Sequence, residues 1–106
     1  MLLLIFPFVS NAQINRSANE LAQERVEEYI VTKLFKDFVY KPGSFSQLKS
    51  RKRPQSDIVW SINHKFEIVD SQFVADKKVA VTKPYYFSFY LDKKLKVLTA
   101  ESFYRQ

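Results

Sequence analysis

Basic side chains supply the most evident chemistry in this sequence. The densest cluster, "KSRKR", opens a charged, proline-containing stretch at residues 49–56, called here the basic loop. Lysine and arginine bind phosphate and other anionic groups through Coulomb attraction and through the release of counterions from a polyanion. The candidate binding residues for a polyanion, a lipid head group or an acidic glycan are Lys49, Arg51, Lys52 and Arg53. The alternative is that the stretch is a solvated hairpin loop without a ligand.

An aromatic run that begins at Tyr85 offers a second candidate contact surface. Strand alternation places Tyr86, Ser88 and Tyr90 on one face of the predicted strand. Aromatic faces stack on sugar CH groups, and tyrosine hydroxyls add hydrogen bonds. Tyr86 and Tyr90 are therefore candidate binding residues for a sugar ring or a peptide. The alternative is cross-strand packing that stabilises the sheet.

The single histidine gives little support for catalysis. His64 falls in register with Ile62 and Phe66, so its ring should point toward the core. A general base needs a group that orients it, and the acids that bound its strand, Asp57 and Asp70, are far from it along the chain. The chain has no Cys and one Gly, which excludes a thiol nucleophile, a thiolate metal site and a glycine-rich phosphate loop. We expect His64 to be structural, and we expect no catalytic residue, metal site or cofactor.

Charge is distributed unevenly along the chain. The formal net charge is +6, and residues 18–39 carry five acids and three bases, which leaves −2 in that segment and +8 in the rest. The basic part of the chain therefore favours an anionic partner without identifying one.

The first predicted element is a helix. Apolar residues recur every four positions from Ala22 to Phe38, which predicts an amphipathic helix of five or six turns. Ser17 and Glu20 fit a capping box at its start. The helix should end near Tyr40, because Pro42-Gly43 follows.

The remainder of the chain alternates with a period of two, which predicts antiparallel strands. A polar connection is expected at Asp70–Lys78 and a turn at Asp92-Lys-Lys94. The predicted strands cover residues 44–48, 58–68, 79–91 and 95–100. These elements predict a single α+β domain over residues 13–106, in which one N-terminal amphipathic helix packs on a curved antiparallel sheet of about four strands, cystatin-like in shape.

The first residues indicate an export signal. Leu2–Val9 is an apolar run much shorter than the roughly 20 residues that span a bilayer. Ser10-Asn-Ala12 supplies the small side chains that precede a signal-peptidase cut. We expect a signal peptide at residues 1–12, cleavage between Ala12 and Gln13, and a periplasmic or secreted protein with no transmembrane segment in the mature chain. No Lys or Arg precedes the apolar run, so either the amino terminus supplies the charge or the true start lies upstream. The alternative is a buried first strand or helix.

Three short motifs carry a resemblance to known proteins: Pro42-Gly-Ser44, His64-Lys-Phe66 and Phe89-Tyr-Leu-Asp92. In this order, after a helix, they resemble a group of small exported proteins of Bacteroidota-type bacteria that have no assigned activity. The resemblance implies an envelope location and a helix-plus-sheet fold. True cystatins block cysteine proteases with a Gln-x-Val-x-Gly loop, and no such motif occurs here, so inhibition is not expected.

The expected function is that of an exported, non-enzymatic binding or structural domain of the bacterial envelope. Its partner would be an envelope protein or an anionic polymer, and export would separate it from nucleic acid. One alternative is a small ligand-binding or enzymatic domain with a pocket between helix and sheet. Another is a structural subunit whose exposed strand edge pairs with a partner.

Overall fold

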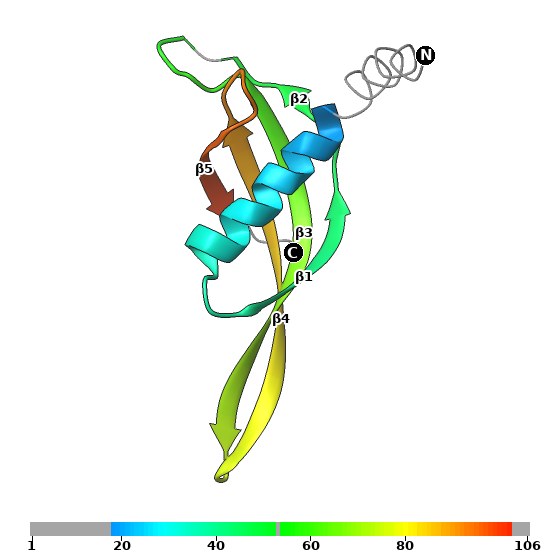
Figure 1. The fold of residues 1–106 in the computed structure, drawn as a ribbon, viewed down its shortest axis with the longest axis vertical. Helices are drawn as coiled ribbons and strands as arrows, with labels where there is room; N and C mark the ends of the chain where they lie inside the picture. The colour runs from blue at the N-terminus through cyan, green and yellow to red at the C-terminus, as the bar shows by residue number, and fades with distance from the viewer. Residues whose placement is uncertain (1–17, 53, 103–106) are drawn as a thin grey trace, which may run out of the picture.

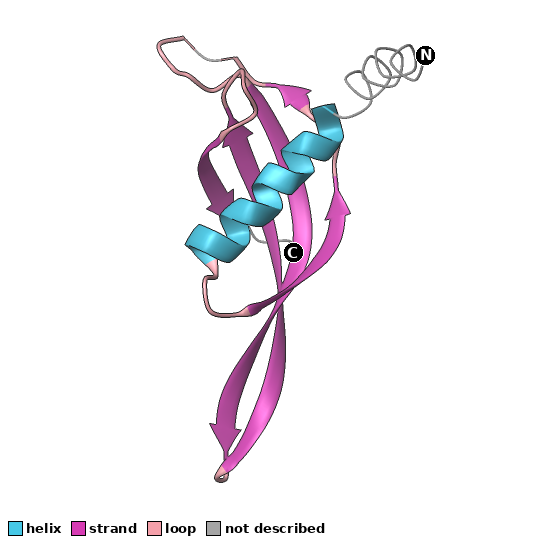
Figure 2. Ribbon diagram, viewed as in Figure 1, coloured by secondary structure: helices cyan, strands magenta, loops and turns pink. Residues whose placement is uncertain are grey.

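The structure is a computed structural model that describes residues 18–52 and 54–102. One helix lies across one face of an antiparallel sheet, and a long two-stranded hairpin projects from the sheet beyond the helix (Figure 1). Figure 2 shows that the two strands of this hairpin run without interruption from the body into the projection. The predicted signal peptide, its cleavage position and the cap at Ser17 lie outside the described residues.

The helix is shorter than its sequence pattern predicts. It is α-helical over residues 18–29 and continues as a π-helical turn, η2 (Ile30–Leu34). The backbone leaves helical geometry at Phe35, whose N–H donates to the carbonyl of Ile30 at 2.7 Å. The predicted end near Tyr40 is therefore wrong, and Phe38 is 40% exposed instead of lying on the apolar stripe. A π turn closes over five residues rather than four, so it breaks the spacing on which the prediction depended.

Five strands form one open antiparallel sheet. The strands are β1 (Val39–Phe45), β2 (Lys49–Ser50), β3 (Trp60–Val74), β4 (Lys77–Leu91) and β5 (Val97–Ser102). Their order is β1-β3-β4-β5, and β2 pairs with β3 beyond the end of β1. The α+β class and the packing of one helix on an antiparallel sheet are confirmed.

The predicted limits of several segments are wrong, and the last strand, predicted at residues 95–100, covers Val97–Ser102. The first strand starts at Val39 and includes Pro42-Gly43, which the sequence pattern placed in a turn before residue 44. The stretch Asp70–Lys78 is not a polar connection, because β3 and β4 pair continuously down to Val74 opposite Lys77. Only Ala75 and Asp76 remain as a two-residue turn, and both have positive φ, at 52° and 69°. This turn lacks the Asn-Gly or Asp-Gly pair that usually marks such a hairpin in a sequence.

The core lies between the helix and the inner face of the sheet. The helix contributes Ala22, Val26 and Ile30, each fully buried. The rings of Tyr29 and Phe89 contact each other edge-on with their centroids 6.2 Å apart, and the ring centroids of Phe35 and Tyr85 are 4.8 Å apart. The buried apolar residues of the sheet are Ile62, Phe66, Ile68, Phe87, Phe89, Leu91 and Val97. Large aromatic rings thus provide the burial that a small domain without disulfides requires.

The single glycine allows β1 to approach β3 closely. The register between the two strands shifts between Pro42 and Phe45. A Cβ at Gly43 would collide with the backbone carbonyl oxygen of Lys65. Glycine is therefore required here for close approach, and the resulting irregularity places the carbonyl of Ser44 over the core residue His64.

Candidate functional site

The structure brings two basic segments together at one end of the molecule. The N–H of Arg51 donates to the carbonyl of Val59 at 2.7 Å, and the N–H of Val59 donates to the carbonyl of Leu91 at 2.9 Å. Val59 therefore lies between the basic loop and the end of β4, and it fixes the loop at the same end of the sheet as the turn between β4 and β5. Both segments lie at the end of the long axis opposite the hairpin tip (Figure 1). We call this region the cationic end; its basic residues are Lys49, Arg51, Lys52, Lys93, Lys94 and Lys96.

Three of the four basic residues predicted as binding residues lie at the cationic end. Lys49 is in β2 opposite Ser61, and Arg51 and Lys52 follow it in the loop, all exposed. Arg53, the fourth, lies outside the described residues. The turn that carries Lys93 was predicted from the sequence, but its position at the same end of the molecule as the basic loop was not.

A hollow of about 350 Å³ lies between the end of the basic loop, at Ser56, and the turn between β4 and β5. Its lining includes Asp57, Lys93 and Lys94. Asp92 also lines it, and one oxygen of its carboxylate, Oδ1, accepts hydrogen bonds from the N–H groups of Lys94 and Lys96, at 2.8 and 3.0 Å. These bonds, with Lys96 contributing most, hold the pKa of the Asp92 carboxyl below its ordinary value. Asp92 therefore acts as a charged anchor of the turn, which presents the lysine side chains to solvent.

The predicted tyrosine face is less open than its pattern indicates. Tyr86 lies on the outer face of the sheet opposite Lys65 and is half-buried. Tyr90, on the same face, is buried, and its hydroxyl donates to Oε1 of Glu101 at 3.0 Å. This arrangement leaves the ring of Tyr86 as the more accessible of the two.

The buried histidine is held by a chain of hydrogen bonds that crosses three elements. His64 on β3 is fully buried, and its Nδ1 lies 2.9 Å from the carbonyl oxygen of Ser44 on β1. A carbonyl oxygen only accepts, so Nδ1 carries the proton and Nε2 accepts in the neutral ring. Nε2 lies 2.7 Å from the hydroxyl of Tyr40, which is also 3.0 Å from Oε2 of Glu27 on the helix. The single proton of the Tyr40 hydroxyl is therefore shared between two acceptors, Nε2 of His64 and Oε2 of Glu27.

Burial determines the protonation states of His64 and Tyr40 in this hydrogen-bonded chain. It lowers the pKa of His64 from 6.5 to about 4, against a smaller opposite effect of the bond to Ser44. Burial, with the hydrogen bond and negative charge of Glu27, raises the pKa of Tyr40 well above its ordinary value. Both groups are thus neutral at pH 7. Both ring nitrogens of His64 are engaged, and Phe45 stacks on the ring at 3.6 Å, so this histidine is built into the core.

The predicted core-facing position of His64 is confirmed, whereas its partners were not foreseen. Asp57 and Asp70 were the acids considered, and the actual partners are Tyr40 and Ser44. The pairing of β1 with β3, which brings Tyr40 opposite Ile68, was not predicted from the sequence. Among the described residues, no three acidic or histidine side chains converge as a metal site would require.

An open groove of about 550 Å³ lies between the helix and the start of β5. Its basic side chains are Arg25, Lys33 and Lys96, and Glu28 lies among them. Tyr29 and Leu98 supply apolar surface. The groove is on the surface, and the space between helix and sheet is filled by the packed rings of the core.

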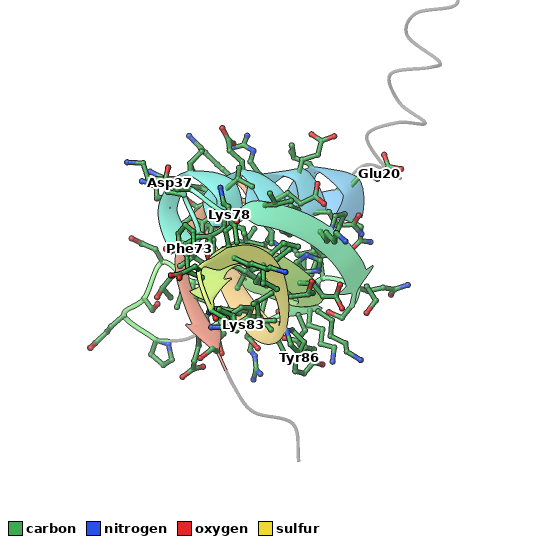
Figure 3. All side chains as sticks on the ribbon, turned by 90° about the horizontal axis from the view of Figure 1, so that it is seen from below. Glu20, Asp37, Phe73, Lys78, Lys83 and Tyr86 are labelled. Atoms are coloured by element: carbon green, nitrogen blue, oxygen red, sulfur yellow. The ribbon has the colours of Figure 1, made fainter. Side chains whose placement is uncertain are left out.

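The projecting hairpin is the feature that sequence reasoning missed most completely. Beyond Val69, β3 pairs only with β4, and residues 70–81 pair with no other described strand. We call residues 70–81 the arm. Phe73 and Val74 on the arm are 76% and 57% exposed. Figure 3 looks onto the arm along the long axis, with Phe73, Lys78 and Lys83 labelled.

Comparisons with protein families, with curated proteins and with solved structures found no match in any of the three. Within the described residues, no helical segment has both the length and the apolar character needed to cross a membrane.

Proposed function

We propose that this chain is an exported, non-enzymatic binding domain of the bacterial envelope and that its cationic end contacts an anionic partner. The proposal includes a cystatin-like fold, which the helix lying across antiparallel strands supports. It also retains the resemblance to small exported proteins of Bacteroidota-type bacteria. The described residues that carry this resemblance include Pro42 in β1 and His64 in β3.

One observation carries the proposal: two basic segments distant in sequence lie at the same end of the molecule, separated by the backbone at Val59. Arg51 and Lys94 are more than forty residues apart in sequence, yet the backbone of Val59 links the segment of Arg51 to the end of β4, next to the turn that carries Lys94. Like charges gathered in one place disfavour the compact state. An anionic partner would offset that repulsion and release its own counterions, so the cluster suits binding better than stability.

The proposal is tested with two charge-reversal variants matched in charge. The first, Arg51→Glu/Lys52→Glu/Lys94→Glu, changes the cationic end, and the second, Lys77→Glu/Lys78→Glu/Lys83→Glu, changes the arm and the part of β4 just beyond it. The probe is polyphosphate immobilised on a sensor surface, at several salt concentrations. The first variant should weaken binding by roughly tenfold or more and flatten its salt dependence, while the second should retain most of the affinity.

Two results would contradict the proposal. Equal weakening by both variants would mean that only net charge matters. Binding by the unaltered protein that does not respond to salt would exclude an electrostatic contact. Urea denaturation of each variant provides the control for folding.

The groove beside β5 supports a second candidate function, binding of a small anionic ligand. Arg25 and Lys33 would bind the negatively charged group of the ligand, and Leu98 would contact its apolar part. Mass spectrometry of the protein purified under native conditions tests this function. A co-purifying organic anion that is lost in Arg25→Glu would support it, and its retention in that variant would argue against the groove.

A further inference from the structure

We propose that the arm is a self-association element, in which two copies of this chain pair along the free edge of β3 at residues 70–74. The paired arms would form one four-stranded antiparallel sheet about a two-fold axis. This inference rests on the arm alone and is independent of the proposed function of the cationic end.

The arm has little to stabilise it within one chain. A two-stranded hairpin without a packed face is marginally stable in water. Yet the arm extends β3 and β4 by five cross-strand pairs beyond Val69, from Asp70 opposite Val81 to Val74 opposite Lys77. It also exposes Phe73, the most exposed large apolar side chain of the described residues. Exposed apolar surface on a projecting element is typical of a contact site.

The two edges of the arm differ in their protection against strand pairing. The β4 strand carries Lys77 and Lys78 within the arm, and Lys83 and Pro84 follow just beyond it. Lysine and proline are the residues with which proteins block pairing at sheet edges. The β3 strand carries neither from Asp70 to Val74. One edge is therefore blocked by its residues, and the other is open to a strand.

The turn determines which backbone groups face outward. In a hairpin with a two-residue turn, the two residues that flank the turn, here Val74 and Lys77, form a hydrogen-bonded pair. Along the rest of the hairpin, hydrogen-bonded pairs alternate with pairs that are not hydrogen-bonded to each other. Ser71 and Phe73 consequently direct their N–H and C=O groups away from β4, to the open edge. On the blocked edge, the corresponding residues are Lys78 and Ala80.

In one register, a second copy of the chain can form hydrogen bonds with the outward N–H and C=O groups of Ser71 and Phe73. Antiparallel pairing centred on Gln72 places Ser71 opposite Phe73 of the second copy, and both residues of each pair face the shared edge. The two Phe73 rings then lie diagonally on one face, within reach of each other. Asp70 lies opposite Val74 of the second copy, so no like charges are opposed.

The same register also covers apolar surface at the base of the arm. β1 occupies the edge of β3 up to Val39, which pairs with Val69. The next free position is Asp70, so the tip of the second arm would reach the start of β1. Val39 and Phe38 are 59% and 40% exposed there. A single contact thus accounts for four exposed apolar side chains, and the cationic ends of the two copies point away from each other.

The experiment compares two proline substitutions in one cross-strand pair. Ser71 and Ala80 are paired, and each has an outward N–H, on the open and the blocked edge respectively. Sedimentation equilibrium of the full chain, of 12.6 kDa, is measured at concentrations from ~1 µM to ~1 mM. The average mass of the unaltered protein and of Ala80→Pro should rise toward that of a dimer. Ser71→Pro should remain a monomer across the same range.

A second pair of variants keeps the test decisive if proline distorts the arm. Ser71→Lys adds a blocking charge to the open edge, and Ala80→Lys adds the same charge to the edge that already has lysines. Only the former should abolish the dimer. The proposal is overturned if the unaltered protein stays monomeric throughout, or if the substitutions at Ser71 and Ala80 reduce association equally.

Discussion

The hydroxyl of Tyr40 lies 2.7 Å from Nε2 of His64, and this contact joins β1 to β3 at a point where the helix also approaches. His64 is fully buried, so its Nε2 has no water to replace a lost donor. The contact therefore contributes to holding β1 on the sheet as well as to the orientation of the ring.

Replacing Tyr40 by Phe should destabilise the protein. The substitution keeps the ring but removes the proton that Nε2 accepts, and a buried acceptor without a partner costs about 1–3 kcal/mol. Urea denaturation measures the change in the free energy of unfolding. A Tyr40→Phe variant as stable as the unaltered protein would mean that the hydroxyl donates to Glu27 alone.

Stability should fall as the pH is lowered from about 6.5 toward 4. The pKa of His64 is about 4 in the folded protein and 6.5 ordinarily, so between these values the unfolded chain binds a proton that the folded chain does not. The stabilisation is complete above 6.5 and is lost as the pH approaches 4. Thermal unfolding of the protein and of His64→Gln across this range measures it.

The His64→Gln variant separates the histidine from the carboxylates, which also titrate near pH 4. The difference in stability between the two proteins should shrink as the pH falls. A difference that is constant with pH would show that His64 is protonated to the same extent in both states.

Gly43→Ala should destabilise β1 through a steric clash. The added methyl would meet the backbone carbonyl of Lys65, which cannot rotate away as a side chain could. Overpacking of this kind costs about 1–3 kcal/mol. Ser44→Ala, at an exposed neighbouring side chain, is the control and should change stability little. Equal stability of the two variants would show that β1 can shift to accommodate a Cβ.

Ala75→Asn should stabilise the arm. Ala75 has φ of 52°, a region in which asparagine is better tolerated than alanine. Amide hydrogen exchange on both strands of the arm should slow in Ala75→Asn and quicken in Ala75→Val, because a β-branched residue is disfavoured at positive φ. Exchange that changes in the same direction in both variants would contradict a left-handed turn.

The sequence was sufficient to predict elements that bury an apolar face. The stripe through Ala22, Val26 and Ile30 predicted the helix, and alternation around Ile62 and Phe89 predicted the central strands, because burial imposes those periods. The arm buries no face, so its residues alternate poorly and resemble a loop. The end of the helix was misplaced because the π turn changes the spacing after Ile30.

The candidate site was predictable only within each segment. The cluster at Arg51 is evident in the sequence, but its position at the same end of the molecule as Lys94 depends on the backbone bonds of Val59, which no local pattern records. The partners of His64 depend likewise on the pairing of β1 with β3, which the Gly43 irregularity permits.

The most direct test of the central claim, that the cationic end binds an anionic partner, is a two-dimensional NMR titration of the ¹⁵N-labelled protein with short-chain polyphosphate. The account predicts that the largest shift changes fall on the amides of residues 49–52 and 92–96, and that they diminish as salt is added. Changes concentrated on the arm, or spread evenly over all basic residues, would contradict it.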